Sequence, residues 1–293
     1  MLNNGYNVIK VITTLHSSLT EGMVHRVAIA QNIEAQCTTN FEEMYSEVKK
    51  SNPDLQIVIS FKKLPENIWS FPKYGTVNLH FSLLPQYRGA APINWVIMNG
   101  EKVTGVTTFF VNDKLDCGDI ILQKEVALQE GESYHSLGAK LCHVGTFLIY
   151  DTIDEIIKHG KNVKTYHNAE YLPICKKAPK ITKEICTIDF SKSSTELMNW
   201  YTGLSNYNRY WEVVYKNGKK QLLIIKSANF VPQPRGLKPG ELLSDGKSFL
   251  HIGCKDGEVV IYEIQVPGKR DKITISEFLN GYKSRLNYTQ YSG

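Results

Sequence analysis

The 293-residue sequence predicts an α/β fold, in which a doubly wound, mostly parallel sheet is followed by a small β-barrel of OB-like form. In the first half of the chain, short apolar runs alternate with segments of helical periodicity. A basic, loop-like stretch then interrupts this pattern, and brief strand-like segments separated by glycine turns follow it. A chain of this length exceeds one ordinary core. We therefore expect a first domain over 1–177, a linker over 178–190 and a second domain over 191–293.

The first elements follow the rhythm of strand, helix, strand. Residues 7–14 (NVIKVITT) and 57–61 (IVISF) are rich in β-branched residues, as are strands buried on both faces of a parallel sheet. Between them, residues 41–48 carry apolar side chains at helical spacing. Thr39 and Glu42 have the spacing of a capping box, so we expect a helix to begin there.

The rest of the first domain continues this alternation. Pro92 and Gly100 bracket a short predicted helix, because proline favours the first turn and glycine the residue after the last one. Two strands are expected over 104–111 and 119–128. A long amphipathic helix should then occupy residues 133–160.

The second domain is predicted to be mostly β. After a short helix over 194–203, glycine turns recur in the dipeptides Asn-Gly at 217, Pro-Gly at 239, Asp-Gly at 245 and 256, and Pro-Gly at 267. Short strands at this spacing are typical of a small barrel. Thr274 and Glu277 form a second capping-box pattern before a final helix.

Charge and composition narrow the class of protein. The net charge is +5, but residues 176–293 hold 19 Lys and Arg against 11 Asp and Glu, a net of +8. This excess suits nucleic-acid phosphates, and it is equally compatible with a solvated surface. No apolar run is long enough for a membrane span and no signal peptide is evident, so we expect a cytoplasmic protein. The six cysteines form no CxxC pair or metal-ligand cluster, so neither disulfides nor a metal are expected.

Polar side chains gather around one predicted strand, residues 76–81. Asn78 and His80 alternate with apolar neighbours, so both should point to the same face. A half-exposed strand would show the same alternation without any function. The segment after it, residues 82–92, contains proline, glycine and arginine and should form a shaped loop at the carboxyl end of the strand. Open α/β sheets bind their ligands at that place.

These residues form a longer motif. The pattern N-x-H-x-S-L-L-P-x-Y-R-G begins at Asn78, and Asp116 follows 36 residues after His80 within Leu-Asp-Cys-Gly-Asp. The motif resembles that of the folate-dependent formyltransferases, and the similarity extends over nearly the whole chain. It implies a formyltransferase-like Rossmann variant with Asn78, His80 and Asp116 as the catalytic set.

The chemistry of formyl transfer explains these residue types. When an amine attacks a formyl carbon, the carbonyl oxygen becomes negative and needs a preorganised donor such as the amide of Asn78. A histidine with its ordinary pKa of about 6.5 can relay a proton at neutral pH, and Asp116 would orient the ring and stabilise its charged form. The attacking α-amino group has a pKa of about 7.7 to 8.0, so much of the catalysis can come from positioning.

The resemblance also implies a donor and its slot. The donor would be 10-formyltetrahydrofolate, with its pterin held by the loop after residues 57–61 and by the loop before Asp116. The residues predicted to bind it are Phe61, Lys63, Leu64, Val111 and Leu115. Lys62 and Lys63 could meet the folate carboxylates or could simply be solvated.

The loop after His80 is predicted to contact the substrate through Ser82, Leu83, Leu84, Pro85 and Arg88. Arg88 could bind a phosphate or carboxylate. It could instead fix the loop through backbone carbonyls.

The sequence around this loop is most similar to that of family members that formylate methionyl-tRNA. The implied acceptor is the α-amino group of initiator methionyl-tRNA, for translation initiation, with the basic barrel against tRNA phosphates and the protein acting as a monomer. Two alternatives stay open: a sugar-nucleotide N-formyltransferase, which shares the same trio, and a non-catalytic tRNA-binding remnant.

The sequence departs from the family pattern in two places. Family members open with a central strand, a Gly-x-Pro turn and a helix, and this sequence begins near the end of that helix. We therefore expect a truncated gene model or a degraded gene, and unpaired backbone groups inside the fold. The tRNA enzymes also carry a basic loop after the second strand, whereas Thr13 to Val24 contain no Lys or Arg.

Overall fold

The structure is a computed structural model that describes residues 5–13, 19–59, 62–168, 175–232, 236–282 and 285–290. The chain forms two compact units. The first comprises Met1–Arg88, Gly105–Val126 and Leu141–Lys176, and the second comprises Gly89–Thr104, Ala127–Lys140 and Lys177–Gly293. Each unit is therefore assembled from separate stretches of the chain, and each is described by itself below.

The first unit opens with a pair of parallel strands. Strand β1 (Lys10–Thr13) confirms the strand predicted over 7–14, and it pairs with β2 (Glu34–Cys37). Helix α1 (Leu19–Ala30) connects the two strands. The sequence pattern did not reveal β2, because its four residues, Glu-Ala-Gln-Cys, lack the apolar run that marks a buried strand.

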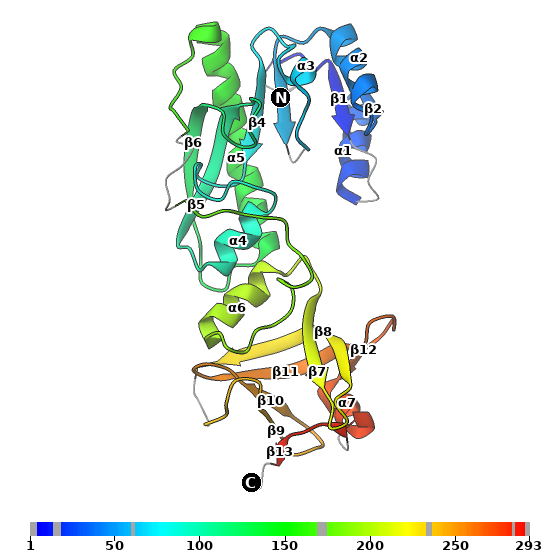
Figure 1. Ribbon diagram of the computed structural model, residues 1–293. Helices are drawn as coiled ribbons and strands as arrows, with labels where there is room; N and C mark the ends of the chain where they lie inside the picture. Colours follow the sequence, from blue (N-terminus) through cyan, green and yellow to red (C-terminus); the bar gives the residue numbers. More distant parts are fainter. Residues whose placement is uncertain are drawn as a thin grey trace. The chain divides into compact units, whose positions relative to one another are not determined.

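A four-stranded sheet carries the rest of the first unit (Figure 1). Its order is β3 (Gln56–Ile59), β4 (Thr76–His80), β5 (Val103–Phe110) and β6 (Ile120–Ala127). Strands β3 and β4 are parallel, whereas β4 and β5 are antiparallel, so the sheet is mixed. The α/β class predicted from the sequence is confirmed.

Helices cover these strands. Helix α2 (Phe41–Ser51) was predicted, but its expected cap was wrong: Asn40 is the N-cap, and its side chain accepts a hydrogen bond from the Glu42 backbone N–H at 2.8 Å. Asn competes well for this position because its side-chain oxygen reaches the free N–H groups of the first turn. Buried residues of α2 pack with Val58 and with Ile68 of the short helix α3 (Glu66–Trp69).

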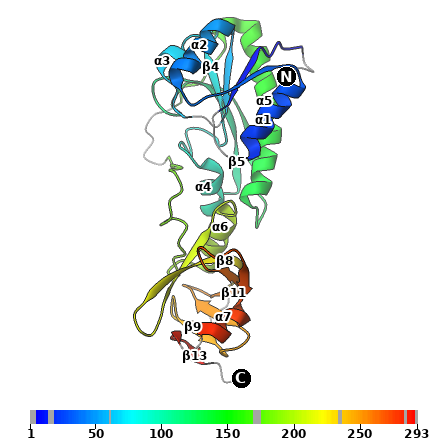
Figure 2. The ribbon, with the colours of Figure 1, turned by 90° about the vertical axis from the view of Figure 1, so that its right-hand side faces the viewer.

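The long predicted helix is α5 (Tyr134–His159), followed by a short 3-10 helix over Gly160–Asn162. In Figure 2 it runs beside the strands of the sheet. Ile156 of α5 packs with Val77 of β4 and Ile121 of β6. Gly145 lies against Leu79, and a Cβ there would come within 2.8 Å of the leucine side chain, so the helix and the strand approach closely.

Strands β1 and β3 are not hydrogen-bonded to each other: the described strands form one sheet of β1 and β2 and another that starts at β3. A cavity of about 920 Å³ lies between them, lined by residues 5–12, by Gln56 to Ile59 and by Ile153 and Ile156 of α5. The facing edges of β1 and β3 thus lie on either side of this cavity, and the unpaired backbone groups expected from the sequence stay a prediction.

The helices of the second unit include α4 (Pro92–Met98) and α6 (Ser194–Gly203), both predicted. They approach closely at Gly203, where a Cβ would lie 2.8 Å from the Met98 side chain. The Asn94 amide donates to the Gly203 carbonyl at 2.7 Å and to Asn206 Oδ1 at 2.8 Å. A capping box of Ser193 and Glu196 starts α6.

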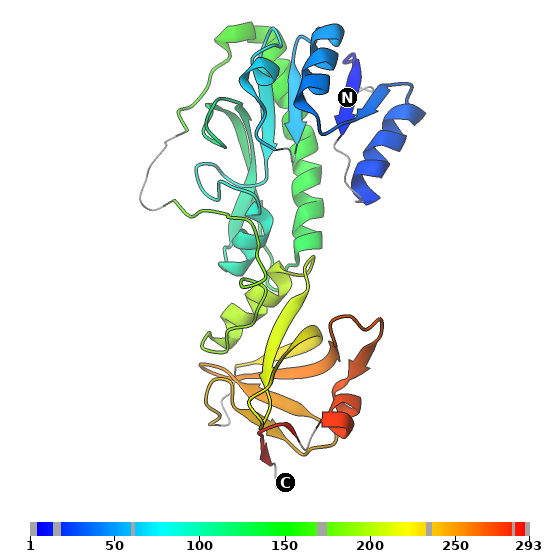
Figure 3. The same ribbon diagram turned by 45° about the vertical axis from the view of Figure 1, so that its right-hand side comes forward.

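A curled sheet forms most of the second unit (Figure 3). Its order is β13 (Thr289–Gln290), β9 (Leu242–Ser244), β10 (Leu250–Gly253), β11 (Glu258–Gln265), β8 (Lys220–Val231) and β7 (Arg209–Val214), with β12 (Lys272–Thr274) beside β11. Helix α7 (Ile275–Tyr282) begins at the predicted capping box of Thr274 and Glu277. Its Phe278 joins Leu223, Leu250 and Ile252 in the core, where all four are fully buried. The predicted β-rich second part is thereby confirmed.

Among the residues that the structure describes, no helix combines the length and apolar character needed to cross a membrane.

Candidate active site

The site is built on strand β4. In the antiparallel register with β5, Asn78 lies opposite Phe109 and His80 lies opposite Thr107. Residues two apart on a strand point to the same face, so Asn78 and His80 share one side of the sheet, as expected. His80 is buried and Asn78 is half-buried.

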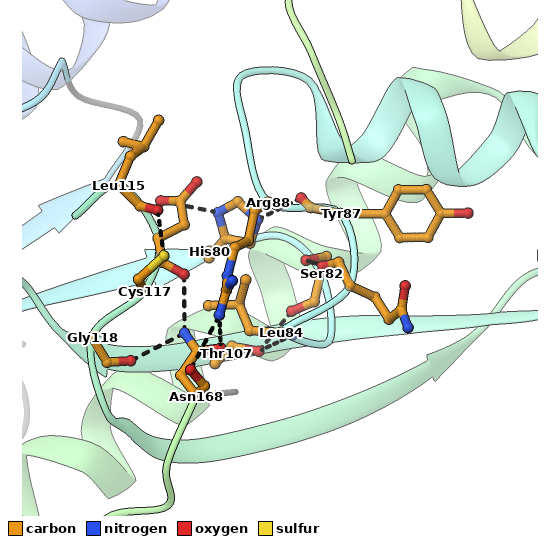
Figure 4. Close-up of polar contacts among 12 residues, drawn as sticks. His80, Ser82, Leu84, Tyr87, Arg88, Thr107, Leu115, Cys117, Gly118 and Asn168 are labelled. Atoms are coloured by element: carbon orange, nitrogen blue, oxygen red, sulfur yellow. Dashed lines mark hydrogen bonds and ion pairs between the residues drawn. The ribbon is translucent and has the colours of Figure 1, made fainter. Parts of the chain in front are cut away.

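Both ring nitrogens of His80 have partners (Figure 4). Nε2 lies 3.0 Å from the Tyr87 backbone oxygen, and Nδ1 lies 3.9 Å from Asp116 Oδ1. A carbonyl oxygen can only accept, so Nε2 must carry a hydrogen and donate it. The other ring nitrogen, Nδ1, faces Asp116. The fold thus brings His80 and Asp116 together although 36 residues separate them.

This arrangement can bind and release one proton at a defined atom. In the neutral ring, the Nδ1 lone pair would face the Asp116 carboxylate. A protonated ring instead places its positive charge and its new Nδ1–H beside that carboxylate, while Nε2–H still donates to the Tyr87 carbonyl. The separation of 3.9 Å is within ion-pair range but exceeds a direct hydrogen bond.

The loop after β4 is shaped by its own polar side chains. Ser82 is fully buried, and its hydroxyl donates to the Gln86 carbonyl at 2.6 Å. Thr107 Oγ1 donates to the Ser82 carbonyl at 2.6 Å and accepts from the Leu84 N–H at 3.2 Å. Gln123 Nε2 completes the network by donating to the Leu84 carbonyl at 2.8 Å and to Thr107 Oγ1 at 2.9 Å. The loop geometry thus depends on β5 and β6 as well as on its own sequence.

The residues predicted to contact the substrate occupy different positions in this loop. Ser82 and Leu84 are buried, and Leu84 packs with Phe109 and Ile120. Leu83 and Pro85 are half-buried, and the Leu84–Pro85 peptide bond is cis. Ser82 and Leu84 therefore maintain the loop, and the substrate contact of this group stays a prediction.

Arg88 makes the kind of contact that fixes a loop. Its Nη2 donates to Asn168 Oδ1 at 2.6 Å and to the Asn168 backbone oxygen at 3.3 Å. Asn168 is fully buried and also donates from Nδ2 to the carbonyls of Asp116, at 2.9 Å, and Gly118, at 3.1 Å (Figure 4). One amide thus touches both loops of the site.

The Asp116 loop has an unusual backbone. Asp116 is buried at a φ of +53°, in the left-handed region that residues with a side chain seldom adopt. At Gly118 a Cβ would collide with the Phe110 carbonyl oxygen. The turn between β5 and β6 therefore needs a glycine two residues after a residue of positive φ.

Of the five residues predicted to bind the folate, the structure describes four. Phe61 lies outside the described residues. Lys63 is exposed, whereas Leu64 is buried and packs with Met44 and Ile68 at the edge of the cavity beside β1. In the second loop, Val111 is half-buried and Leu115 is 59% exposed, so Leu115 presents apolar surface next to Asp116.

Four residues of this site were missing from the sequence-based assignment: Tyr87, Thr107, Gln123 and Asn168. Tyr87 lies within the motif, but it acts through its backbone oxygen, which no side-chain pattern reveals. Asn168 comes after the long helix, in the bland sequence Thr-Tyr-His-Asn, where nothing signals a buried amide. Contacts between segments so far apart require the fold.

Metal-ligand geometry is not found in the described part of the chain, which holds no group of three or more His, Cys, Asp or Glu residues placed to share an ion. Cys117, next to Asp116, is a partly exposed thiol whose Sγ donates to the Leu115 carbonyl at 3.1 Å.

The chain combines a mixed α/β sheet, a His–Asp pair at the end of β4 and, later in the sequence, a curled sheet. Comparison with known proteins identifies the family that has these features. Residues 10–153 match the family "Formyl transferase", and residues 180–283 match "Formyl transferase, C-terminal domain". The protein belongs to the formyl transferase family.

Individual relatives narrow the similarity. A protein of Flavobacterium johnsoniae, "Methionyl-tRNA formyltransferase", is 37% identical over 289 residues, which cover 96% of this chain and 90% of that protein. Among solved structures, HypX from Aquifex aeolicus in complex with tetrahydrofolic acid has a TM-score of 0.65 at 18% identity, over 97% of this chain and 49% of HypX. The sugar 3N-formyl transferase WlaRD has a TM-score of 0.57 at 20% identity, over 92% of both chains. The structural likenesses show the shared fold.

Proposed function

We propose that this protein transfers a formyl group from 10-formyltetrahydrofolate to the α-amino group of initiator methionyl-tRNA. The observation that carries the proposal is the buried His80–Asp116 pair, 3.9 Å apart at the carboxyl end of β4. The acceptor is inferred from the relative of Flavobacterium johnsoniae, which matches over nearly the full length of both chains.

Supporting observations favour a folate as the donor. Leu115 offers an exposed apolar side chain beside Asp116, against which a flat pterin ring could lie. The related structures of HypX and WlaRD are described with tetrahydrofolic acid and 5-N-formyl-THF, respectively. Lys63 is exposed in the neighbouring loop, where it could meet the negative tail of such a molecule.

The residues of the site divide the reaction between them. As the amine nitrogen bonds to the formyl carbon, negative charge builds on the formyl oxygen, and the Asn78 amide donates to it. His80 takes the proton lost by the amine at Nδ1, beside Asp116, while Tyr87 keeps Nε2–H in place. The bond between the formyl carbon and the folate nitrogen then breaks, and His80 returns the proton from Nδ1 to that nitrogen. Tetrahydrofolate and formylmethionyl-tRNA leave.

An assay with two acceptors tests the proposal. The purified full chain is incubated with 10-formyltetrahydrofolate and either initiator methionyl-tRNA or a dTDP-linked amino sugar, and products are identified by mass spectrometry. We expect formylmethionyl-tRNA from the parent and from His143→Gln, whose histidine is exposed on α5, and a loss of product with His80→Gln. Formylation of the sugar alone would support the sugar-nucleotide alternative. Binding of tRNA without transfer would support the non-catalytic remnant.

The basic C-terminal part is proposed to contact tRNA phosphates. Residues 176–293 carry a net charge of +8, and each phosphate contact releases condensed counterions. We expect log K for tRNA to fall with log salt by roughly 0.7 to 0.9 per contact, measured by filter binding. A flat salt response would remove the basis for this surface.

A further inference from the structure

We propose that Asn168 is a positioning residue that sets the approach of Asp116 to His80. The inference rests on the proposed function, because it concerns the same pair. Asn168 follows α5 and lies 52 residues beyond Asp116, yet its side chain is fully buried between the two site loops.

The donor side of the amide holds the Asp116 loop. Nδ2 carries two hydrogens, and both are used, one on the Asp116 carbonyl at 2.9 Å and one on the Gly118 carbonyl at 3.1 Å. These bonds bracket the turn in which Asp116 has a positive φ. Because that backbone conformation is rarely populated, surrounding contacts must maintain it, and the Asn168 amide supplies two of them.

The acceptor side holds the other loop. Asn168 Oδ1 accepts from Arg88 Nη2 at 2.6 Å, and Arg88 directly follows Tyr87, whose backbone oxygen accepts from His80. A bond from a guanidinium is stronger than one between neutral groups. The contacts therefore close a ring that runs from His80 through Tyr87, Arg88 and Asn168 to Asp116 and back to His80 (Figure 4).

This ring explains why a residue without access to a substrate would affect turnover. Asn168 contacts no reacting group, but releasing its two donor bonds frees the turn that aims Asp116 at Nδ1. A shift of about 1 Å between reacting groups can lower a rate by about 100-fold. A purely structural amide, by contrast, would affect folding and leave turnover per folded molecule unchanged.

Asn168→Asp separates these roles. Aspartate has nearly the same shape and keeps an oxygen for Arg88, but it cannot donate to the two carbonyls. The matched control is Thr152→Val in α5: Thr152 is also fully buried and bonds to the Leu148 carbonyl at 2.6 Å and Thr108 Oγ1 at 2.8 Å, away from the site. Asn168→Ser, which retains one donor, serves if the aspartate variant does not fold.

The expected result is a fall in kcat of about 100-fold for Asn168→Asp, with KM for both substrates changed by less than about threefold. The serine variant should fall between this value and the parent. Thr152→Val should lower the melting temperature and leave kcat unchanged. The positioning role is overturned if Asn168→Asp, folded at the assay temperature, retains kcat within about threefold of the parent.

A second measurement does not depend on activity. Cys117 adjoins Asp116 and is partly exposed, so its alkylation by iodoacetamide, followed by peptide mass spectrometry, reports the order of this turn. We expect the rate at Cys117 to rise in Asn168→Asp and not in Thr152→Val. A parent that forms no formylmethionyl-tRNA would defeat the proposed function, whereas an unchanged Cys117 rate would defeat the role of Asn168.

Discussion

The loops around His80 and the strands at the start of the chain belong to the same compact unit, yet they are fixed by different means. Strand β4 pairs with a strand on either side, and side chains from β5, β6 and the segment after α5 hold the loop that follows it. Among the strands that the structure describes, β1 pairs with β2 alone, and its other side faces a cavity of about 920 Å³. Contacts from several elements thus keep the site ordered, although β1 in the same unit has a single pairing partner among the described strands.

Among the changes that test this difference between the site and β1, the largest effect is expected at His80. We predict that His80→Ala lowers turnover by about 10²- to 10⁴-fold, the range for loss of a general acid or base. Steady-state formylation kinetics measure it, and circular dichroism confirms that the variant is folded. Turnover close to that of the parent would mean that the ordered loops serve another purpose.

A smaller loss is predicted at Asn78. Its replacement by alanine should lower turnover by roughly 10²- to 10³-fold, because one donor to the developing oxyanion disappears. Because Asn78 is half-buried on β4, stability should change little compared with activity. Near-normal turnover in Asn78→Ala would rule out the role given to its amide, and His143→Gln provides the unaffected reference.

Native-state hydrogen exchange measures the difference between β1 and β4 without an activity assay. Amides of β1 should exchange through local opening, with protection at least about 100-fold lower than amides of β4, since pairing on one side is easier to break. Equal protection of the two strands would show that the edge of β1 is covered in solution.

The smallest effect is predicted at the exposed edge of β3. Ile59 is 50% exposed, and Ile59→Lys should change the free energy of unfolding by no more than about 0.5 kcal/mol. A charge there should reduce self-association, because uncovered strand edges recruit other strands. Light scattering at increasing concentration tests this. Tyr262→Lys is the control and should have less effect, because Tyr262 is almost equally exposed but lies on β11, which is paired on both sides.

Much of the fold was predictable because periodicity carries it. The apolar runs at β1 and β3 and the proline and glycine around α4 were sufficient signals. Strand β2 was missed because a short polar strand has no such pattern. The α2 cap was placed at Thr39 because sequence spacing cannot tell which of two adjacent polar residues adopts the cap conformation, and Asn40 does.

The candidate site divides in the same way. The pairing of His80 with Asp116 followed from a motif, and the structure brings the two residues within ion-pair distance. The support around them did not follow from the sequence, because Thr107, Gln123 and Asn168 act through single contacts to distant backbone groups. Such contacts leave no periodicity, and their partners are chosen only when the chain has folded.

Gly118 makes the site sensitive to substitution at a position outside the proposed catalytic set. Gly118 lies two residues after Asp116. Any other amino acid at position 118 would force its Cβ into the Phe110 carbonyl oxygen. A substitution of Gly118 would therefore be expected to inactivate the protein while Asn78, His80 and Asp116 all remain in place, and an inspection of those three residues alone would not detect the damage.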